Sequence, residues 1–179
     1  MKQAPDDISP PELARMSVEA YVRSGETLEP PDKPQGILAG RAGTFVTLRT
    51  HDGELRGCIG TVEPVCETKA EEIIQNALSS ALRDPRFPPV EPQELNGLIY
   101  GVDVLSPPES ARGLEDLDPS QYGIIIETID GEQRGLLLPR IEGIETCEDQ
   151  WLAVHRKAGI KPGTPIKVER FTVTRFGKD

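Results

Sequence analysis

A cysteine beside an arginine, set among glycines, is the first feature of this sequence that could do chemistry. Arg56, Gly57, Cys58 and Gly60 fall within one run, residues 55–61. A thiol in a positive field is favoured as the thiolate, the form that acts as a nucleophile. Cys58 is therefore the candidate catalytic residue. The alternative is that Cys58 is inert and is simply the small residue that fits on a crowded strand.

A second group of candidates lies in the block Asp84-Pro85-Arg86-Phe87. The planar forks of Arg56 and Arg86 can bind a carboxylate or a phosphate, and Asp84 could orient one of them. The alternative is that Asp84 and Arg86 pair with each other or with the backbone and shape this proline-rich bend. The candidate ligand-binding residues are Arg56, Gly57, Gly60, Asp84, Arg86 and Phe87.

The two glycines of the run interrupt a predicted strand. Gly57 and Gly60 indicate a close backbone approach or a bulge, which often lies near a site. The alternative is that a bulky neighbouring side chain fills the space that each glycine leaves.

Other common chemistries lack their sequence signals. The chain has no Walker A loop, GxGxxG, GxSxG or HExxH motif. Two histidines, and three cysteines without CxxC spacing, argue against a structural zinc or iron–sulfur site. We therefore expect no metal and no cofactor.

Composition restricts the partners and the compartment. Lys plus Arg total 20 against 30 for Asp plus Glu, a net charge of −10, which disfavours nucleic-acid binding by the whole surface but leaves a local basic patch open. No apolar run approaches the roughly 18 residues of a membrane span. Residues 1–7 are acidic and lack the apolar region of a signal peptide. The odd number of cysteines agrees with a reducing compartment, so a cytoplasmic protein is expected.

The elements that must position the candidates follow from hydrophobic spacing. Residues 44–50 and 54–62 predict a hairpin joined at Asp52-Gly53, a dipeptide that suits a type I′ turn. Residues 68–82 predict a helix that begins with a capping box at Thr68. A strand follows over 98–105. An earlier helix is expected over 9–25, with a capping box at Ser9.

The second half of the chain repeats this order. Strands over 122–129 and 132–139 flank Asp130-Gly131, a helix follows Thr146, and a strand covers 166–176. The prediction is an α+β fold of two related lobes, each a hairpin followed by a helix and a further strand. We expect one domain over 1–179, with lobe one over about 42–106 and lobe two over about 120–176.

The first hairpin has two different faces. With a two-residue turn, Val46 lies opposite Ile59 on an apolar face, and Arg49 lies opposite Arg56 on the face that carries Cys58. Like charges in such a pair destabilise it unless an acidic residue or a bound anion lies between them.

Six blocks in order resemble the AMMECR-type domain family and cover roughly residues 10 to 176. They are the runs 45–48, 55–61, 84–90, 104–109, 135–139 and 157–159. The resemblance implies two lobes with a cleft between them, and it places the 55–61 and 84–90 blocks near one surface. In bacteria and archaea, relatives are associated with a Memo-like protein and a radical SAM protein. The chain departs from the family at 118–123, which lack the expected histidine and aspartate, and at 176–179, which lack the usual glutamate.

Two functional hypotheses follow, and the sequence leaves the reaction, the oligomeric state and the partner open. In the first, the chain is an accessory or binding component that docks a Memo-like protein, a radical SAM protein or a small anionic ligand. In the second, it is a cysteine-dependent enzyme that acts on a small anionic substrate, with Cys58 as the nucleophile. The first hypothesis is preferred because no acid or base is found near Cys58 in the sequence.

Overall fold

The structure is a computed structural model that describes residues 2–177. Met1, Lys178 and Asp179 lie outside the described residues, so part of the expected departure at the chain end does too. The helices are α1 (Pro10–Ser24), α2 (Lys69–Leu82) and α3 (Cys147–Ala158), with short 3-10 helices η1 (Gly36–Leu38), η2 (Leu95–Gly97) and η3 (Leu114–Asp116). The strands are β1 (Thr44–Thr50), β2 (Leu55–Thr61), β3 (Leu98–Leu105), β4 (Glu109–Ser110), β5 (Gly123–Thr128), β6 (Arg134–Leu137), β7 (Ile166–Phe171) and β8 (Val173–Phe176).

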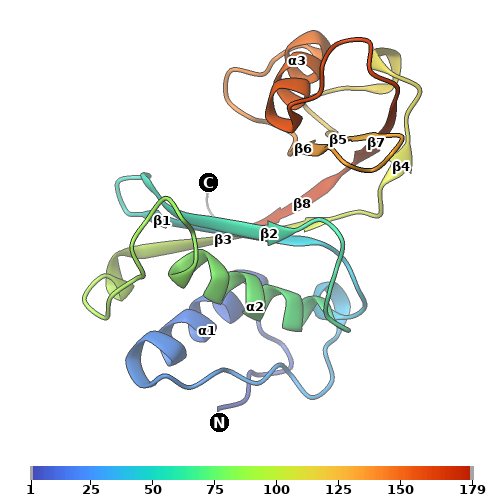
Figure 1. The fold of residues 1–179 in the computed structure, drawn as a ribbon. Helices are drawn as coiled ribbons and strands as arrows, with labels where there is room; N and C mark the ends of the chain where they lie inside the picture. The colour runs from blue at the N-terminus through green and yellow to red at the C-terminus, as the bar shows by residue number, and fades with distance from the viewer. Residues whose placement is uncertain (1, 178–179) are drawn as a thin grey trace. The chain divides into compact units, whose positions relative to one another are not determined.

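The chain divides into two compact units. Unit 1 comprises Met1–Val104 and Thr174–Asp179, and unit 2 comprises Leu105–Val173. In unit 1 the strands lie in the order β2-β1-β3-β8, with α1 and α2 on one face of the sheet (Figure 1). Its core joins the apolar sides of both helices to that face, through residues that include Leu13, Val18, Val46, Leu48, Ile73, Ala77 and Val102.

Unit 2 repeats this plan. Its sheet has the order β4-β7-β5-β6, and α3 packs on it (Figure 1). The two sheets have the same order, because β2-β1-β3-β8 of unit 1 corresponds to β6-β5-β7-β4 of unit 2. In each unit the two hairpin strands pair antiparallel, and the first hairpin strand also pairs antiparallel with the strand that follows the helix. This confirms the predicted α+β fold of two related lobes, each a hairpin followed by a helix and a strand.

The register of the first hairpin differs from the prediction in one place. Val46 does pair with Ile59, but Arg49 pairs with Leu55, because the register shifts between Leu48 and Arg49. Only Gly53 of the turn has a positive φ, at 86°, whereas a type I′ turn needs two such residues. The Thr50 N–H donates to the Glu54 carbonyl at 2.9 Å, so the loop comprises residues 51–53 rather than two residues. Arg56 is left out of the register, and the predicted pairing of Arg49 with Arg56 is wrong.

Helix capping follows the sequence at two of three positions. Thr68 and Thr146 each form a complete capping box with the residue three positions later, which confirms both predicted helix starts. Ser9 makes no side-chain cap and donates its hydroxyl to Glu12 at 2.7 Å instead. The predicted capping box at Ser9 is therefore wrong, although α1 begins there.

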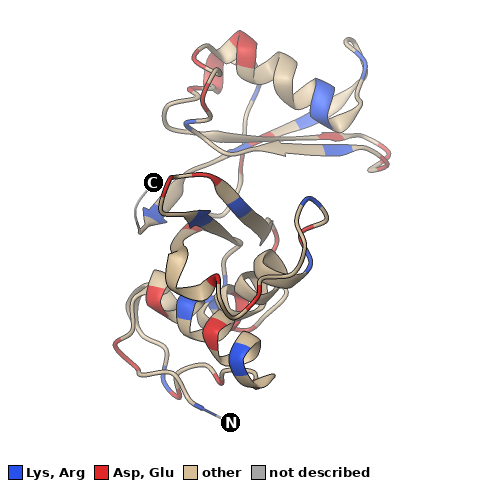
Figure 2. Ribbon diagram, turned by 90° about the vertical axis from the view of Figure 1, so that its left-hand side faces the viewer, with Lys and Arg blue, Asp and Glu red and all other residues tan. Residues whose placement is uncertain are grey.

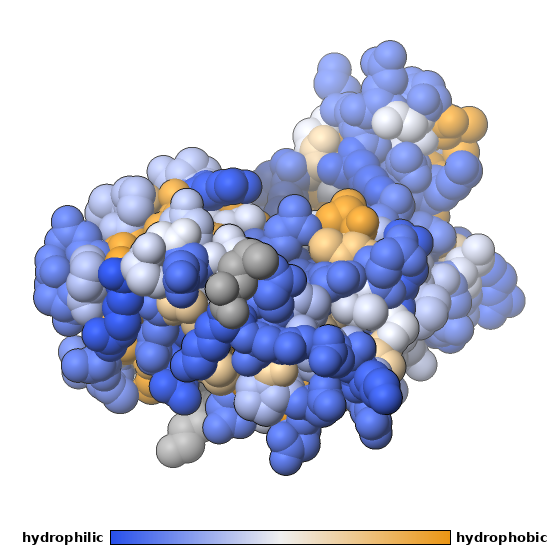
Figure 3. Space-filling view, turned by 90° about the horizontal axis from the view of Figure 1, so that it is seen from below, coloured by the Kyte–Doolittle hydropathy of each residue, from blue (hydrophilic) through white to orange (hydrophobic). Residues whose placement is uncertain are grey.

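Charged residues of both signs occur throughout the chain. Figure 2 shows Lys and Arg interspersed with Asp and Glu in both units. The face of unit 1 that carries α1 is mainly hydrophilic, with separate hydrophobic spots (Figure 3). Within residues 2–177, no helix combines the length and the apolar character that crossing a membrane requires.

Candidate functional site

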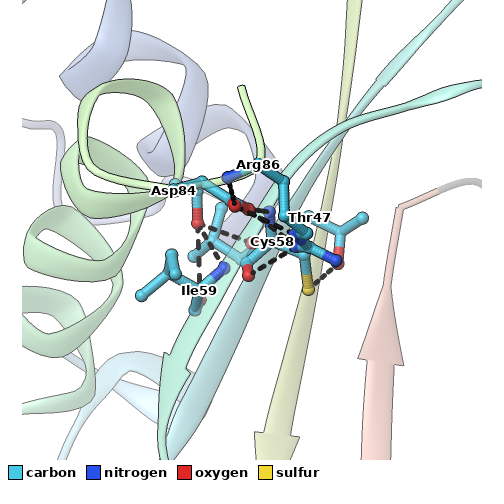
Figure 4. Close-up of polar contacts among 7 residues, drawn as sticks. Thr47, Cys58, Ile59, Asp84 and Arg86 are labelled. Atoms are coloured by element: carbon cyan, nitrogen blue, oxygen red, sulfur yellow. Dashed lines mark hydrogen bonds and ion pairs between the residues drawn. The ribbon is translucent and has the colours of Figure 1, made fainter. Parts of the chain in front are cut away.

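Five of the predicted site residues come together at the outer edge of β2. We call this group the Cys58 cluster: Arg56, Cys58, Asp84, Arg86 and Phe87. Arg56 and Cys58 lie on β2, and the other three lie in the bend that follows α2. Figure 4 shows Cys58 facing Asp84 and Arg86. Because β2 is an edge strand, main-chain groups of Cys58 point away from the sheet. Its N–H donates to Asp84 Oδ2 at 2.9 Å, and its C=O accepts from Arg86 Nη2 at 3.3 Å.

Asp84 is the centre of this arrangement. Its carboxylate is buried and accepts hydrogen bonds from the Arg86 main chain at 3.1 Å and from Arg86 Nε and Nη2 at 2.9 and 2.7 Å. These bonds, together with the Cys58 N–H, hold the pKa of Asp84 well below its usual range. The same pair raises the pKa of Arg86. Asp84 and Arg86 therefore pair with each other and with the backbone, and half of the Arg86 side chain stays exposed.

Arg56 is held by a carboxylate that the sequence reading missed. Its Nε and Nη2 donate to the two oxygens of Glu94, at 2.7 and 3.0 Å, and this lowers the pKa of Glu94. The Phe87 ring lies between two arginines, with its centroid 5.9 Å from Arg56 Cζ and 5.5 Å from Arg86 Cζ. Glu94 lies 38 residues from Arg56, and nothing in the local sequence links the two.

The Cys58 thiol is half-buried and lies next to a hydroxyl. Its Sγ is 3.3 Å from Thr47 Oγ1 on β1 (Figure 4). The histidines have other contacts, since His51 bonds to the Asn96 carbonyl and His155 bonds to the Trp151 carbonyl. The polar contacts of the thiol within residues 2–177 thus include no general base.

The two glycines of β2 serve packing. A Cβ on Gly57 would lie 2.2 Å from the Ser80 carbonyl oxygen of α2, so Gly57 permits a close helix approach on the covered face. A Cβ on Gly60 would lie 2.3 Å from the Phe45 ring. The structure therefore places Gly57 on the other face from Cys58, and it places an aromatic side chain over Gly60.

A row of polar residues on α2 faces the strands and supports β2. Glu72, Asn76 and Ser80 are buried and follow one another at one-turn spacing. The Ser80 hydroxyl accepts from the Ile59 N–H at 2.8 Å and donates to the Val46 carbonyl at 2.8 Å. Glu72 accepts from the Thr61 hydroxyl and from two main-chain N–H groups of the loop between β2 and α2, those of Val65 and Cys66. The sequence does show these three polar residues at intervals of four. An exposed helix face has the same spacing, so the sequence did not predict that they are buried.

Two other features lie apart from the cluster. A cavity of about 530 Å³ is lined by residues of the N-terminal segment, of the proline-rich loop and of the start of α2, and it shares no residue with the cluster. Among residues 2–177, no three His, Cys, Asp or Glu side chains are grouped as metal ligands.

Comparison with known proteins decides the family. The AMMECR1 family model matches residues 11–178. The chain belongs to the AMMECR1 family. It is 48% identical over 161 residues to a Thermotoga maritima protein, an alignment that covers 89% of this chain and 91% of that one. A Clostridium acetobutylicum protein is 43% identical over 165 residues, but the match spans 34% of its length.

A solved family member has the same fold. The crystal structure of an uncharacterized Pyrococcus horikoshii protein, PH0010, is similar with a TM-score of 0.84 and 33% identity. The superposition covers 95% of this chain and 90% of that one. Matches to several archaeal relatives span about half of their length.

Proposed function

We propose that this chain is an accessory protein that docks a partner protein on the Cys58 cluster. The observation that carries the proposal is that both arginine forks are already bound by carboxylates of the same chain, Arg56 by Glu94 and Arg86 by Asp84. A free anion would have to compete with these internal carboxylates. A partner surface would instead contact a preformed, partly exposed group of arginines around an aromatic ring, which is the composition of interface hot spots.

The make-up of the relatives supports an accessory role. In the Clostridium protein the matched region is about a third of the chain, so there the family domain is joined to further sequence. The family resemblance names the candidate partners, a Memo-like protein and a radical SAM protein. A radical SAM partner would bring its own cluster, since the cysteines of this chain lack the spacing of iron–sulfur ligands.

The test is binding of the purified Memo-like protein and of the purified radical SAM protein from the same genome, measured by calorimetry. We expect Arg56→Ala and Phe87→Ala each to weaken binding about tenfold or more, as loss of a hot-spot residue does. Arg112→Ala is the matched control, because Arg112 also binds a carboxylate with two nitrogens, that of Asp116 in unit 2. Equal affinity of all variants would show that the partner docks elsewhere.

A cysteine-dependent enzyme is the second candidate. The Cys58 thiol is partly accessible, and the Arg86 guanidinium reaches the main chain of the same residue. An enzyme of this kind needs a thiolate at neutral pH. On this hypothesis Cys58 is the nucleophile and Arg86, half of which is exposed, holds a small anionic substrate.

Alkylation by iodoacetamide, followed site by site with mass spectrometry, separates the two candidates. If the enzyme hypothesis holds, Cys58 in the folded chain reacts faster at pH 7 than free cysteine does. Cys66 is the internal reference: burial and Glu72 raise the pKa of its thiol to about 11. Cys66 should therefore react slowly at pH 7 and about tenfold faster for each unit of pH up to that value. A Cys58 rate at or below that of free cysteine would rule against the nucleophile.

A further inference from the structure

The outer edge of β2 is closed by side chains at its centre. β2 is the first strand in the order β2-β1-β3-β8, so no strand lies on its outer side. An edge of this kind presents main-chain N–H and C=O groups that can pair with a strand of another chain. At Cys58 both groups are occupied, the N–H by Asp84 and the C=O by Arg86 (Figure 4).

The two side chains close the edge as one unit. Asp84 Oδ2 accepts from the Cys58 N–H at 2.9 Å and from Arg86 Nη2 at 2.7 Å, and the same Nη2 donates to the Cys58 carbonyl at 3.3 Å. One oxygen and one nitrogen therefore offer Cys58 the acceptor and the donor that a residue of a neighbouring antiparallel strand would offer. The Asp84 side chain is 2% exposed, so it shuts the Cys58 N–H off from an approaching strand.

Other means of protecting a strand edge are weak in β2. Charged side chains, prolines and bulges commonly protect edges. The strand Leu55–Thr61 contains no proline and one charged residue, Arg56, whose charge Glu94 balances. Its register shift lies at the hairpin end, away from Cys58. The protection of the middle of this edge therefore falls to Asp84 and Arg86.

We infer that Asp84 and Arg86 keep the chain from pairing with a second copy of itself through β2. Without them, two β2 strands would pair antiparallel about a twofold axis at Cys58, because each Cys58 has both the N–H and the C=O that the other needs. A second copy is the occupant that every solution of this protein contains. The inference is independent of the proposed docking of a partner protein.

The experiment is sedimentation velocity of the wild type and of Asp84→Ala/Arg86→Ala over about a hundredfold range of protein concentration. Both side chains are removed together so that neither charge is left without its partner. We expect a constant sedimentation coefficient for the wild type and a rise toward that of a dimer for the double variant. Arg112→Ala/Asp116→Ala removes an ion pair with two hydrogen bonds in unit 2, and this control should behave like the wild type.

Hydrogen exchange of peptides from β2 identifies the surface that pairs. In the dilute double variant β2 should exchange faster than in the wild type, because the Cys58 N–H has lost its acceptor. In the concentrated variant the protection should return, because a second β2 supplies a carbonyl. Association without this return places the contact elsewhere and overturns the inference. A constant sedimentation coefficient, although β2 exchanges fast, overturns it as well.

A single variant covers the case in which the double variant does not fold. Half of the Arg86 side chain is exposed, and Arg86→Ala alone frees the Cys58 carbonyl. Association of this variant at high concentration, with β2 protected, supports the inference, and a monomer over the whole range overturns it. Partner binding by the wild type is measured separately, so a failure of the docking function leaves these results unaffected.

Discussion

Asp84 determines the local geometry of the Cys58 cluster. One buried carboxylate receives the Cys58 N–H and three N–H groups of Arg86, so it replaces the neighbouring strand that an edge residue lacks. Four donors on two oxygens hold both the backbone of β2 at Cys58 and the Arg86 side chain. One carboxylate thus ties the bend that follows α2 to the edge of the sheet.

Asp84→Asn should lower the free energy of unfolding by about 1–3 kcal/mol at pH 7, because an amide offers one acceptor oxygen and its NH₂ opposes the N–H donors. The pKa of Asp84 is lowered in the folded chain, so its contribution is fully present above the unfolded value of about 4 and falls as the pH is lowered below it. Urea titrations of both proteins between pH 7 and pH 2 measure this. A difference that stays constant over that range would contradict the role given to Asp84.

At the scale of the elements, the packing of α2 against the first hairpin holds the site in place. The helix approaches Gly57 so closely that a Cβ there would lie 2.2 Å from the Ser80 carbonyl oxygen, and the Ser80 hydroxyl bridges β1 and β2. Apolar burial by Ile73 and Ala77 stabilises the same contact. The edge strand that carries Cys58 is therefore positioned from one side by a helix and from the other by the Asp84 bend.

Gly57→Ala should cost about 1–3 kcal/mol, because the added methyl group would lie 2.2 Å from the Ser80 oxygen and the helix or strand must move. The same shift should loosen the Cys58 cluster, so the amides of β2 should exchange with solvent faster. Gly97→Ala is the control, since nothing lies within 4 Å of its Cβ position and its φ is not positive. Chemical denaturation and hydrogen exchange measure both. A Gly57 variant as stable as the Gly97 variant would show that α2 can retreat without cost.

At the scale of the molecule, the two units share one plan, but the chain completes unit 1 last. It leaves unit 1 after β3, builds unit 2, and returns with β8, which is the outer neighbour of β3. Arg175 of β8 donates to the buried Asp103 at 2.8 Å, and Phe176 packs on the unit 1 core. The stability of the unit that carries the Cys58 cluster therefore depends on the last residues of the family domain.

Deletion of residues 174–179 should destabilise unit 1 by about 3–5 kcal/mol, because Asp103 loses its cation and remains buried. Hydrogen exchange followed by mass spectrometry should show faster exchange in β3, with β5 and β7 of unit 2 unchanged. Deletion of residues 178 and 179 alone is the control for chain length and should leave β3 protected. Equal protection of β3 in both truncated chains would contradict the role of β8.

Local sequence patterns predicted the elements and their repetition. Apolar spacing, Asp-Gly turns and the threonine capping boxes act over a few residues, so they predicted both hairpins, α2, α3 and the two related lobes. Alternation along β2 also put Arg56 and Cys58 on one face. The sequence also named most of the cluster, because its blocks resemble those of the family.

The pairing of the polar groups in the Cys58 cluster depends on contacts between distant segments. Asp84 meets the Cys58 N–H across 26 residues and Glu94 meets Arg56 across 38, and such partners depend on the path of the whole chain. The extra turn residue moved Arg49 away from Arg56, and helix packing turned the polar side of α2 inward to the strands. Short-range periodicity cannot encode these outcomes, because hydrogen bonding and packing between distant segments settle them.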